Sequence, residues 1–423
     1  MNSNKNNIVK ILLVLVSAFG IGMWRWNGFI NSELYTGGVA TQEQTVNEDE
    51  NIQACSVSVE INDGEKVLND AQAELLAGYA RSYADTLCSL NPADVLSLFT
   101  DENENYHINK AAWEILTEIR KMSHMDLTLE KAEITYTVVE TRVSGDTLKI
   151  HITENNLQKF RHMQEDSCSY NINHLFVLQQ SDDGWKIKSH EQEEDFFLLA
   201  IEGWEDATGE TYDDKLRYTV KIITDDAREN KEELKISTGN PPEDIAVKNI
   251  EYNRDAAVEY ARQWCNKRNY EDGYLAYDAF GGNCQNFASQ CIYAGGIAMD
   301  HSGYGESQWK FYSQTLNTKQ AASGRSYSWT GVDPFYTYAT INRSSGMVCQ
   351  ADLQLEYAEK GDVIQVGAYH DWRHSLVVID VMKDSDGNLQ DIIVASNTAD
   401  RWNYPLSAYI YTYPRLIHII GQN

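Results

Sequence analysis

One short run, GGNCQNFASQC at residues 281–291, combines residue types and spacing that could carry nucleophilic chemistry. From Cys284 the apolar residues recur three, four, seven and eight positions later, which predicts a helix packed against a core through one stripe. Asn283 is a favourable N-cap and Gly295 a favourable stop, so we expect Cys284 in the first helical turn. Free main-chain N–H groups and the helix dipole lower a thiol pKa there, which favours a thiolate that attacks a carbonyl carbon.

A cysteine nucleophile needs a base, and the sequence downstream places a histidine on a predicted strand. Residues 361–366 indicate a turn and a strand, and His374 begins a run of β-branched residues that is typical of a buried strand. A third predicted strand, 392–395, ends just before Asn397. Cysteine on a helix, histidine on a strand and a polar residue after the next strand is the order of papain-like hydrolases, in which the third residue orients the imidazole.

These residues resemble the bacterial putative amidase domain family, which is related to papain-like cell-wall peptidases and amidases. The resemblance covers residues 250–420 and rests mainly on the 281–296 block and on the strand of His374. It implies Cys284 as nucleophile, His374 as general base and then acid, and Asn397 as the residue that orients His374. Looser matches lie at Tyr252–Ala261, Arg268–Tyr270, Ser328–Thr330, Asn397–Arg401 and Pro405–Leu406.

The sequence departs from the family pattern at two positions. Asn283 stands where the family usually has an aspartate, and an asparagine caps a helix equally well. Asn397 stands where the family often has a histidine. An amide can hold an imidazole but contributes no charge, so Asn397 is the weakest of the three assignments, and a turn residue is the alternative.

Other residues near the motif have both a functional and a structural interpretation. His370 competes with His374 for the base, but it sits in a loop, and catalytic groups favour rigid elements. Asn286 and Gln290 flank Cys284 and can bind substrate, although buried amides commonly bond to neighbouring main chain. Tyr277, seven residues before the cysteine, can donate a hydrogen bond to an oxyanion.

Length and patterning predict an α+β protein of several parts. The 423 residues are enough for two to three domains. Two amphipathic helices and then two hairpins precede the motif, an order that resembles a SnoaL-like cone. The papain-like domain, a cysteine helix packed on an antiparallel sheet, follows it. The predicted parts are a signal peptide or membrane anchor at 1–26, a polar tether at 27–60, an α+β domain of unknown role at 61–230, a linker at 231–249 and the catalytic domain at 250–423.

Charge and cysteine spacing exclude several classes of partner. The net charge is −28, and residues 41–240 carry most of it, which repels nucleic acid and anionic lipid surfaces. Seven scattered cysteines do not form a disulfide scaffold, and no spacing names a pair. There is no CxxC, HxH or HExxH motif, so we expect no metal and no cofactor.

The sequence therefore favours an exported cysteine hydrolase of amide or peptide bonds. Export and the family resemblance together suggest bacterial peptidoglycan as the substrate, with the protein secreted or tethered to the membrane by its N-terminal segment. The aromatic stretch 307–338 either lines a substrate groove or fills the core. The alternatives are a cysteine transpeptidase or transamidase, which passes the acyl group to an amine, and a catalytically silent binding module of the cell surface. The sequence gives no oligomeric state.

Overall fold

The computed structural model describes most of the chain, namely residues 54–236, 242–243, 245, 250–303, 307–311, 324–341, 345–369 and 371–423, with the side chains of 233–236 left aside. The predicted export segment, most of the predicted tether and linker, and His370 lie outside these residues. No helix within the described ranges is long and apolar enough to cross a membrane.

After the short strand β1 (Ser56–Asn62), two helices and then long strands follow, as the change from helical to alternating periodicity predicts. The first helix, α2 (Asp70–Ser89), begins with a capping box in which Asn69 and Gln72 each bond the other's main-chain N–H. Asn103 caps the second helix, α3, through the N–H of Tyr106 at 2.9 Å. The elements up to residue 236 are β1 (Ser56–Asn62), α2, α3 (Glu104–Lys121), β2 (Leu129–Ser144), β3 (Thr147–Phe160), β4 (Ser167–Ser181), β5 (Gly184–Gln192), α4 (Asp195–Asp206) and α5 (Tyr212–Ile236).

The C-terminal part packs short helices on a second group of strands. The predicted cysteine helix is α7, and the predicted histidine strand lies within β9. Its elements are β6 (Ile250–Glu251), α6 (Arg254–Trp264), α7 (Cys284–Ala294), α9 (Tyr327–Thr330), α10 (Val332–Ile341), β7 (Met347–Leu353), β8 (Val363–Ala368), β9 (Asp371–Lys383), β10 (Leu389–Ser396), β11 (Asp400–Pro405) and β12 (Tyr413–Gln422).

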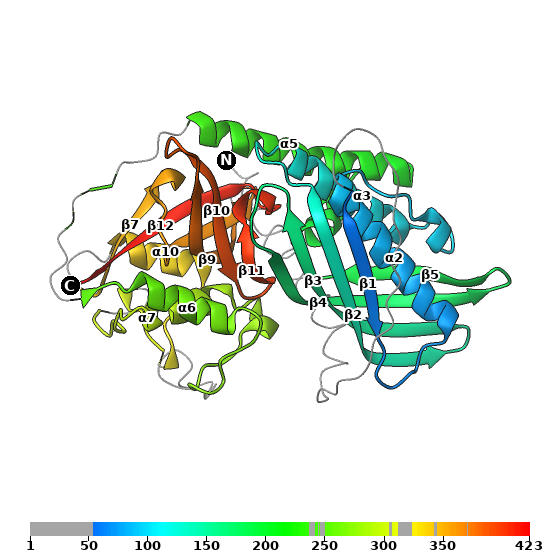
Figure 1. The fold of residues 1–423 in the computed structure, drawn as a ribbon, viewed down its shortest axis with the longest axis horizontal. Coiled ribbons are helices and arrows are strands. Elements are labelled where there is room, and N and C mark those ends of the chain that lie inside the picture. Colours follow the sequence, from blue (N-terminus) through cyan, green and yellow to red (C-terminus); the bar gives the residue numbers. More distant parts are fainter. Residues whose placement is uncertain are drawn as a thin grey trace, which may run out of the picture.

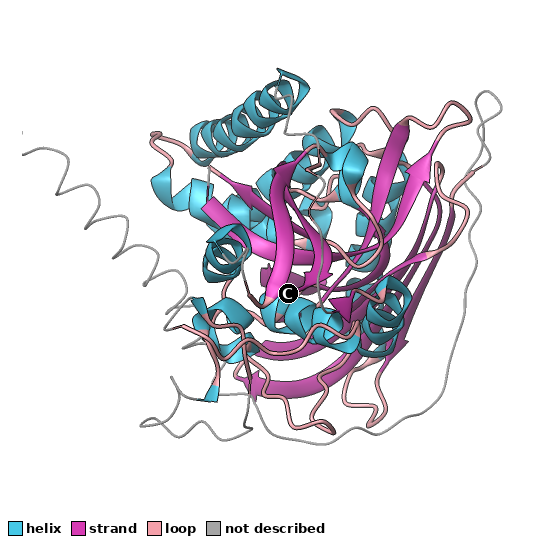
Figure 2. Cartoon of the chain, turned by 90° about the vertical axis from the view of Figure 1, so that its left-hand side faces the viewer, coloured by secondary structure: helices cyan, strands magenta, loops and turns pink. Residues whose placement is uncertain are grey.

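One mixed sheet runs through both parts of the molecule. Its described strands follow the order β1-β2-β3-β4-β11-β10-β9-β8-β12-β6, with β5 also on β4 and β7 also on β12. β1 and β2 are parallel, and the other pairs are antiparallel. Figure 2 shows how strongly the strands curve, with helices packed inside the curve. The α+β class is thereby confirmed.

The two parts join through the pairing of β4 with β11, where Arg401 lies opposite Ser169. Helix α5 extends along the top of both parts in Figure 1, and its Asn230 donates a hydrogen bond to Thr412 at 3.2 Å. His162 forms a second link, with Nε2 at 3.0 Å from the Asp391 carboxylate. The division into separate domains stays a prediction, because the sheet continues across the boundary.

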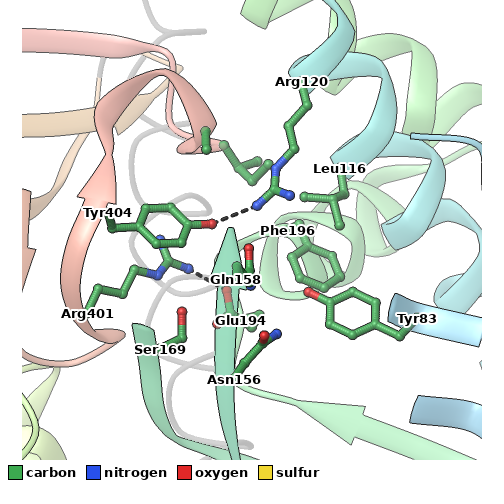
Figure 3. Close-up of a pocket in the computed structure, with 12 residues that line it drawn as sticks. Tyr83, Leu116, Arg120, Asn156, Gln158, Ser169, Glu194, Phe196, Arg401 and Tyr404 are labelled. Carbon is green, nitrogen blue, oxygen red and sulfur yellow. Dashed lines mark hydrogen bonds and ion pairs between the residues drawn. The ribbon is translucent and has the colours of Figure 1, made fainter. Parts of the chain in front are cut away.

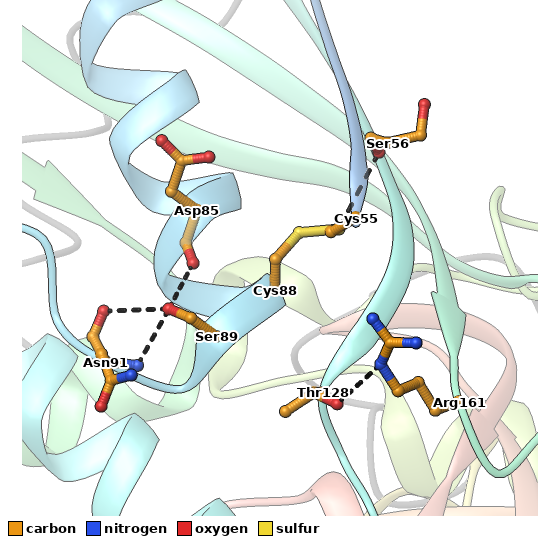
Figure 4. The surroundings of a disulfide bond; sticks show 8 residues. All are labelled: Cys55, Ser56, Asp85, Cys88, Ser89, Asn91, Thr128 and Arg161. Carbon is orange, nitrogen blue, oxygen red and sulfur yellow. Dashed lines mark hydrogen bonds between the residues drawn. A yellow bond between two sulfur atoms is a disulfide. The ribbon is translucent and has the colours of Figure 1, made fainter. Parts of the chain in front are cut away.

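A disulfide between Cys55 and Cys88 ties the start of β1 to the last turn of α2 (Figure 4). The spacing of the cysteines did not identify this pair. The remaining five cysteines, Cys284 among them, are free thiols.

Candidate active site

Cys284 is the first residue of α7, as predicted, and the helix ends at Ala294, before Gly295. The chain enters through Gly281 and Gly282, whose φ angles of 104° and 122° lie in the left-handed region that favours glycine. Helix α7 packs on β9, and its Gln285 Oε1 accepts a hydrogen bond from the Ser375 hydroxyl at 2.7 Å. The glycine turn thus delivers Cys284 to the place where α7 meets β9.

The Cys284 sulfur lies against the main chain of β9 and is almost fully buried, with 6% of the residue exposed. The N–H groups of Ser375, Gln285 and Cys284 itself favour the thiolate. Burial acts more strongly and raises the pKa of the thiol to about 11, and the charge of Asp195 adds to the rise. The predicted lowering of the thiol pKa is therefore wrong for this closed site, because the cost of removing a thiolate from water exceeds the gain from the N–H groups.

His374 lies on β9 in register with Val366 of β8 and is also 6% exposed. Its Nε2 atom is buried and has no hydrogen-bond partner among the residues that the structure describes. The ring of Tyr409 lies 6.2 Å away, centroid to centroid. Burial, together with the positive charge of Arg401, lowers the pKa of His374 to about 3. The imidazole is neutral near pH 7, which is the form that accepts a proton.

The structure brings Cys284 and His374 to the same contact between α7 and β9. The N–H that points at the sulfur belongs to Ser375, the residue next to His374. Across the part of the chain that the structure describes, no hydrogen bond joins the thiol to the imidazole. Both groups are neutral near pH 7, so the two do not form a thiolate–imidazolium ion pair.

Asn397 is buried but bonds away from His374. Its Nδ2 donates to the carbonyl oxygens of Trp264 at 3.2 Å and Cys265 at 2.9 Å. Its Oδ1 accepts a hydrogen bond from Asn283 Nδ2 at 2.7 Å. In this arrangement Asn397 fixes the residue before Cys284 rather than the imidazole.

Asn283 occupies the N-cap position without using its side chain as a cap. Its Oδ1 instead accepts hydrogen bonds from the N–H of Tyr277 at 3.1 Å and from Asn286 Nδ2 at 2.9 Å, and its own N–H donates to Thr398 Oγ1 at 2.7 Å. The predicted side-chain cap is therefore wrong. The side-chain oxygen of Asn283 is occupied by these hydrogen bonds, so the side chain holds the turn before α7 in place instead of capping the helix.

The side chains of Asn286 and Gln290 form hydrogen bonds with neighbouring groups of the protein, as the structural interpretation of these two residues predicts. Asn286 also donates to the Leu275 carbonyl at 2.9 Å, and its Oδ1 accepts from Trp329 Nε1 at 2.9 Å. Gln290 Oε1 accepts from the Tyr260 hydroxyl at 2.7 Å. Both amides brace α7 against its neighbours.

The Tyr277 ring lies beneath the Arg325 guanidinium, 4.9 Å from it, and burial raises the pKa of its phenol. Tyr277 thus packs beside the turn before Cys284. Its contribution of a hydrogen bond to an oxyanion stays a prediction.

Most described aromatics of the 307–338 stretch belong to the core. Trp309 and Trp329 are fully buried, with ring centroids 4.6 Å apart. Phe335 and Tyr338 are also buried, whereas Tyr327 is 62% exposed. Of the described rings, Tyr327 is therefore the one best exposed to meet a substrate.

Sequence reasoning missed a buried charged cluster at the junction of the two parts, around a small polar cavity (Figure 3). Arg401 of β11 bonds Glu194 through Nη2 at 2.5 Å, and its guanidinium lies over the rings of Tyr404 and Tyr409. Arg120 of α3 donates to the Tyr404 hydroxyl at 2.6 Å. The cavity leaves room for little more than a water molecule.

Asp195, next to Glu194, was also missed. Its Oδ2 atom is buried without a hydrogen-bond partner, and burial raises its pKa to about 6. The local signal was an acidic run, Glu193 to Asp195, at a helix start, which reads as ordinary helix capping. Nothing local indicates that this run faces β9 and β11.

The chain is similar to a known protein family and to a bacterial protein. The model of a family described as "Putative amidase domain" matches residues 251–420. An uncharacterized protein of Bacillus subtilis strain 168, YhbB, is 30% identical over 243 residues, which is 56% of this chain and 68% of YhbB. No solved structure matches the chain.

Proposed function

Because the chain belongs to the putative amidase domain family, we propose that it is an exported cysteine hydrolase of amide or peptide bonds in bacterial peptidoglycan. The observation that carries the proposal is the placement of Cys284 at the first turn of a buried helix, with its sulfur against the strand of a neutral His374. Thiol and imidazole are the two groups that thiol-dependent acyl transfer requires.

The reaction would proceed in two halves. His374 takes the proton of the Cys284 thiol as the sulfur attacks the amide carbonyl carbon, which gives an oxyanion and an imidazolium. The C–N bond then breaks, the imidazolium gives its proton to the leaving amine, and a thioester remains on Cys284. Water, deprotonated by His374, attacks the thioester and releases the acid and the free thiol.

The N–H groups at the start of α7 are the candidates for holding the oxyanion. Those of Cys284 and Gln285 already act on the sulfur, so they lie at the right end of the helix for a negative charge that develops beside it. Tyr277, beside the same turn, is a second candidate donor. Asn397 would hold the turn through Asn283, which makes it a positioning residue for the nucleophile.

The substrate class rests on two supports. The family description names an amidase, and residues 1–26 have the composition of an export signal or membrane anchor. A bacterial amidase outside the cytoplasm meets the cell wall, whose stem peptides are joined to sugar and to one another by amide bonds. The charge of the N-terminal part would repel anionic wall polymers, so we assign binding of the peptide to the C-terminal part.

The test is mass spectrometry of purified cell wall treated with the whole chain. The matched pair of variants is Cys284→Ala and Cys291→Ala, because both remove a buried thiol from α7. We expect new fragments with the native protein and with Cys291→Ala, and none with Cys284→Ala. Glycan separated from intact stem peptide would identify an amidase, and shortened stems a peptidase.

The same experiment addresses the alternatives. With an added amine acceptor, products that carry the amine would indicate transfer, whereas purely hydrolysed products would reject it. The silent binding module is favoured by the neutral thiol and imidazole, which share no hydrogen bond within the described residues. It predicts that no fragments form and that alkylation of Cys284 is indifferent to His374→Ala.

A further inference from the structure

The turn between β10 and β11 holds Thr398 in a backbone conformation that is unfavourable for its residue type. The φ angle of Thr398 is 63°, in the left-handed region that favours glycine and that β-branched residues rarely adopt. Such strained residues persist where the surrounding contacts determine them, and they gather at functional sites. The contacts of the Thr398 side chain therefore show why a threonine stands here.

The Thr398 hydroxyl joins two points of the segment that leads to Cys284. Its Oγ1 atom accepts a hydrogen bond from the Asn283 N–H at 2.7 Å and donates one to Asp278 Oδ1 at 2.8 Å. Asp278 precedes the glycine turn, and Asn283 follows it and immediately precedes Cys284. The hydroxyl thus holds the glycine turn at both ends, which neither a glycine nor a valine could do.

Charged groups hold Thr398 itself in place. Its N–H donates a hydrogen bond to Asp400 Oδ1 at 2.8 Å. Arg268 binds both carboxylates, with Nη2 at 2.6 Å from Asp278 Oδ1 and Nη1 at 3.0 Å from Asp400 Oδ2. Asp400 is buried, so water and salt screen this side of the ion-pair network only weakly. Thr398, Asp278, Arg268 and Asp400 therefore form a closed ring of hydrogen bonds beside the glycine turn.

The N-terminal part of the chain contributes one side chain to this ring. Asn171 of β4 donates through Nδ2 to Asp400 Oδ2 at 3.0 Å and to the Asn266 carbonyl oxygen at 2.9 Å. Its neighbour Tyr170 lies opposite Asp400 in the pairing of β4 with β11. The strand pairing that joins the two parts thus also carries a contact toward the turn of the nucleophile.

We propose that Thr398 is a positioning residue for the Cys284 nucleophile and that Asn171, from the N-terminal part, supports it through Asp400. This inference rests on the proposed function. The bond from the Asn283 N–H fixes the main chain one residue before the sulfur and the first N–H groups of α7. A turn that is free to move would misplace the sulfur relative to the substrate carbonyl, which lowers the rate of attack more than the affinity for substrate.

The test compares cell-wall hydrolysis by the whole chain with that by Thr398→Val and Thr398→Ser. Valine keeps the β-branched shape without the hydroxyl, whereas serine keeps the hydroxyl. In Thr398→Val we expect kcat to fall by about 30-fold with KM within about twofold of native, because the sulfur is misplaced while the binding surface is kept. Thr398→Ser should recover most of the loss. A native kcat in Thr398→Val, or an equal loss in Thr398→Ser, would overturn the proposal.

Asn171→Gly tests the contribution of the N-terminal part, also if Thr398→Val does not fold. The φ angle of Asn171 is 56°, which glycine adopts freely, so the change removes the amide without straining the backbone. We expect kcat to fall by about threefold to tenfold at unchanged KM. Hydrogen exchange of peptides spanning 277–287 should become about tenfold faster. Native values of both quantities would reject the support from Asn171.

The matched control is Thr224→Val in α5. The Thr224 hydroxyl donates to main-chain carbonyls of its own helix, so the same chemical change leaves the ring intact. We expect native kcat and native hydrogen exchange at 277–287. A loss of kcat in Thr224→Val as large as that in Thr398→Val would show that the effect is not specific to the ring and would overturn the proposal.

Cys284→Ala separates this proposal from the proposed function. If Cys284→Ala releases fragments as the native protein does, or if neither releases any, the cysteine hydrolase fails and the role of Thr398 fails with it. If release needs Cys284 but Thr398→Val keeps the native kcat, only the role of Thr398 is rejected.

Discussion

Two buried histidines, His190 in the N-terminal part and His374 in the C-terminal part, differ in how completely their ring nitrogens are bonded. Inside the N-terminal part, His190 Nδ1 lies 2.7 Å from Asn109 Oδ1 and 2.9 Å from the Tyr79 hydroxyl, and its Nε2 lies 3.0 Å from His174 Nδ1. In the C-terminal part, His374 Nε2 has no partner within the described part of the chain. Burial lowers the pKa of both His190 and His374, so burial alone does not distinguish the two histidines.

The difference is the one expected between a structural histidine and the general base that we propose. A buried polar group without a partner costs about 1–3 kcal/mol, and proteins rarely leave one unmatched. Both ring nitrogens of His190 have partners within the fold, whereas the neighbouring His174 Nε2 makes no hydrogen bond among the described residues and lies 3.3 Å from Glu154 Oε2. His374 precedes Ser375, whose N–H meets the Cys284 sulfur, and its Nε2 atom has no hydrogen-bond partner among the described residues.

The largest expected effect comes from His374→Ala. We expect amide hydrolysis of cell wall to fall by about 10³-fold, because the general base is lost. Loss of the buried ring should also lower the free energy of unfolding, but by less than loss of a fully bonded histidine, since no hydrogen bond of the Nε2 atom to a described residue is broken. Initial rates of fragment release measure the effect on hydrolysis, and urea unfolding measures the effect on stability. A variant with near-native activity would remove His374 from the mechanism.

His190→Ala should lower stability more than His374→Ala does and leave amide hydrolysis near the native rate. Asn109, Tyr79 and His174 each lose one hydrogen-bond partner in this variant. We therefore expect a loss of roughly 3 kcal/mol in the free energy of unfolding. Urea denaturation followed by circular dichroism measures it. The control is His124→Ala, which removes an exposed ring with one hydrogen bond, to the Gln390 carbonyl. Unchanged stability with lost activity would instead make the cluster a second functional site.

Asp195→Asn should stabilise the protein in a pH-dependent way. Burial raises the pKa of Asp195 from 3.8 to about 6, so in the native protein its contribution is fully favourable below pH 3.8 and is lost as the pH rises through 6. The neutral variant avoids this loss. We expect it to be more stable by about 2 kcal/mol at pH 8 and equal near pH 4. Urea midpoints at both pH values check this; a variant less stable at pH 8 would contradict it.

The smallest effect is expected for Tyr260→Phe. The hydroxyl donates to Gln290 and accepts from Asn269 Nδ2 at 2.7 Å, so its removal should lower stability by about 1 kcal/mol. Hydrolysis should stay within about threefold of native, because Gln290 braces α7 rather than binding substrate. Parallel rate and unfolding measurements decide this. A large fall in activity at native stability would indicate that Gln290 binds substrate.

The sequence predicted the elements whose signals are local. Helix α7 begins at Cys284 and ends before Gly295 because the flanking glycines permit the turns on both sides. The strands of the two N-terminal hairpins follow from residues that alternate between buried and exposed. The position of His374 on a buried strand follows from the β-branched run after it.

The rest depends on contacts between distant parts of the chain. Asn397 faces Asn283 and the end of α6 rather than His374, and this follows from the turn between β10 and β11 rather than from the type of residue. The ion pairs of Glu194 with Arg401 and of Glu202 with Arg373 depend on α4 lying beside β11 and β9. The sign of the Cys284 pKa shift depends on burial, which no local pattern reveals.

The pairing of Ser169 with Arg401 also constrains the order in which the chain can fold. Until β11 exists, residues 168–170 of β4 present an open strand edge, and open edges attract wrong partners. Contacts between segments so far apart in the sequence form slowly, because long loops must close first. The N-terminal part must therefore wait for the last strands of the chain, and a chaperone that shields this edge would raise the yield of native protein.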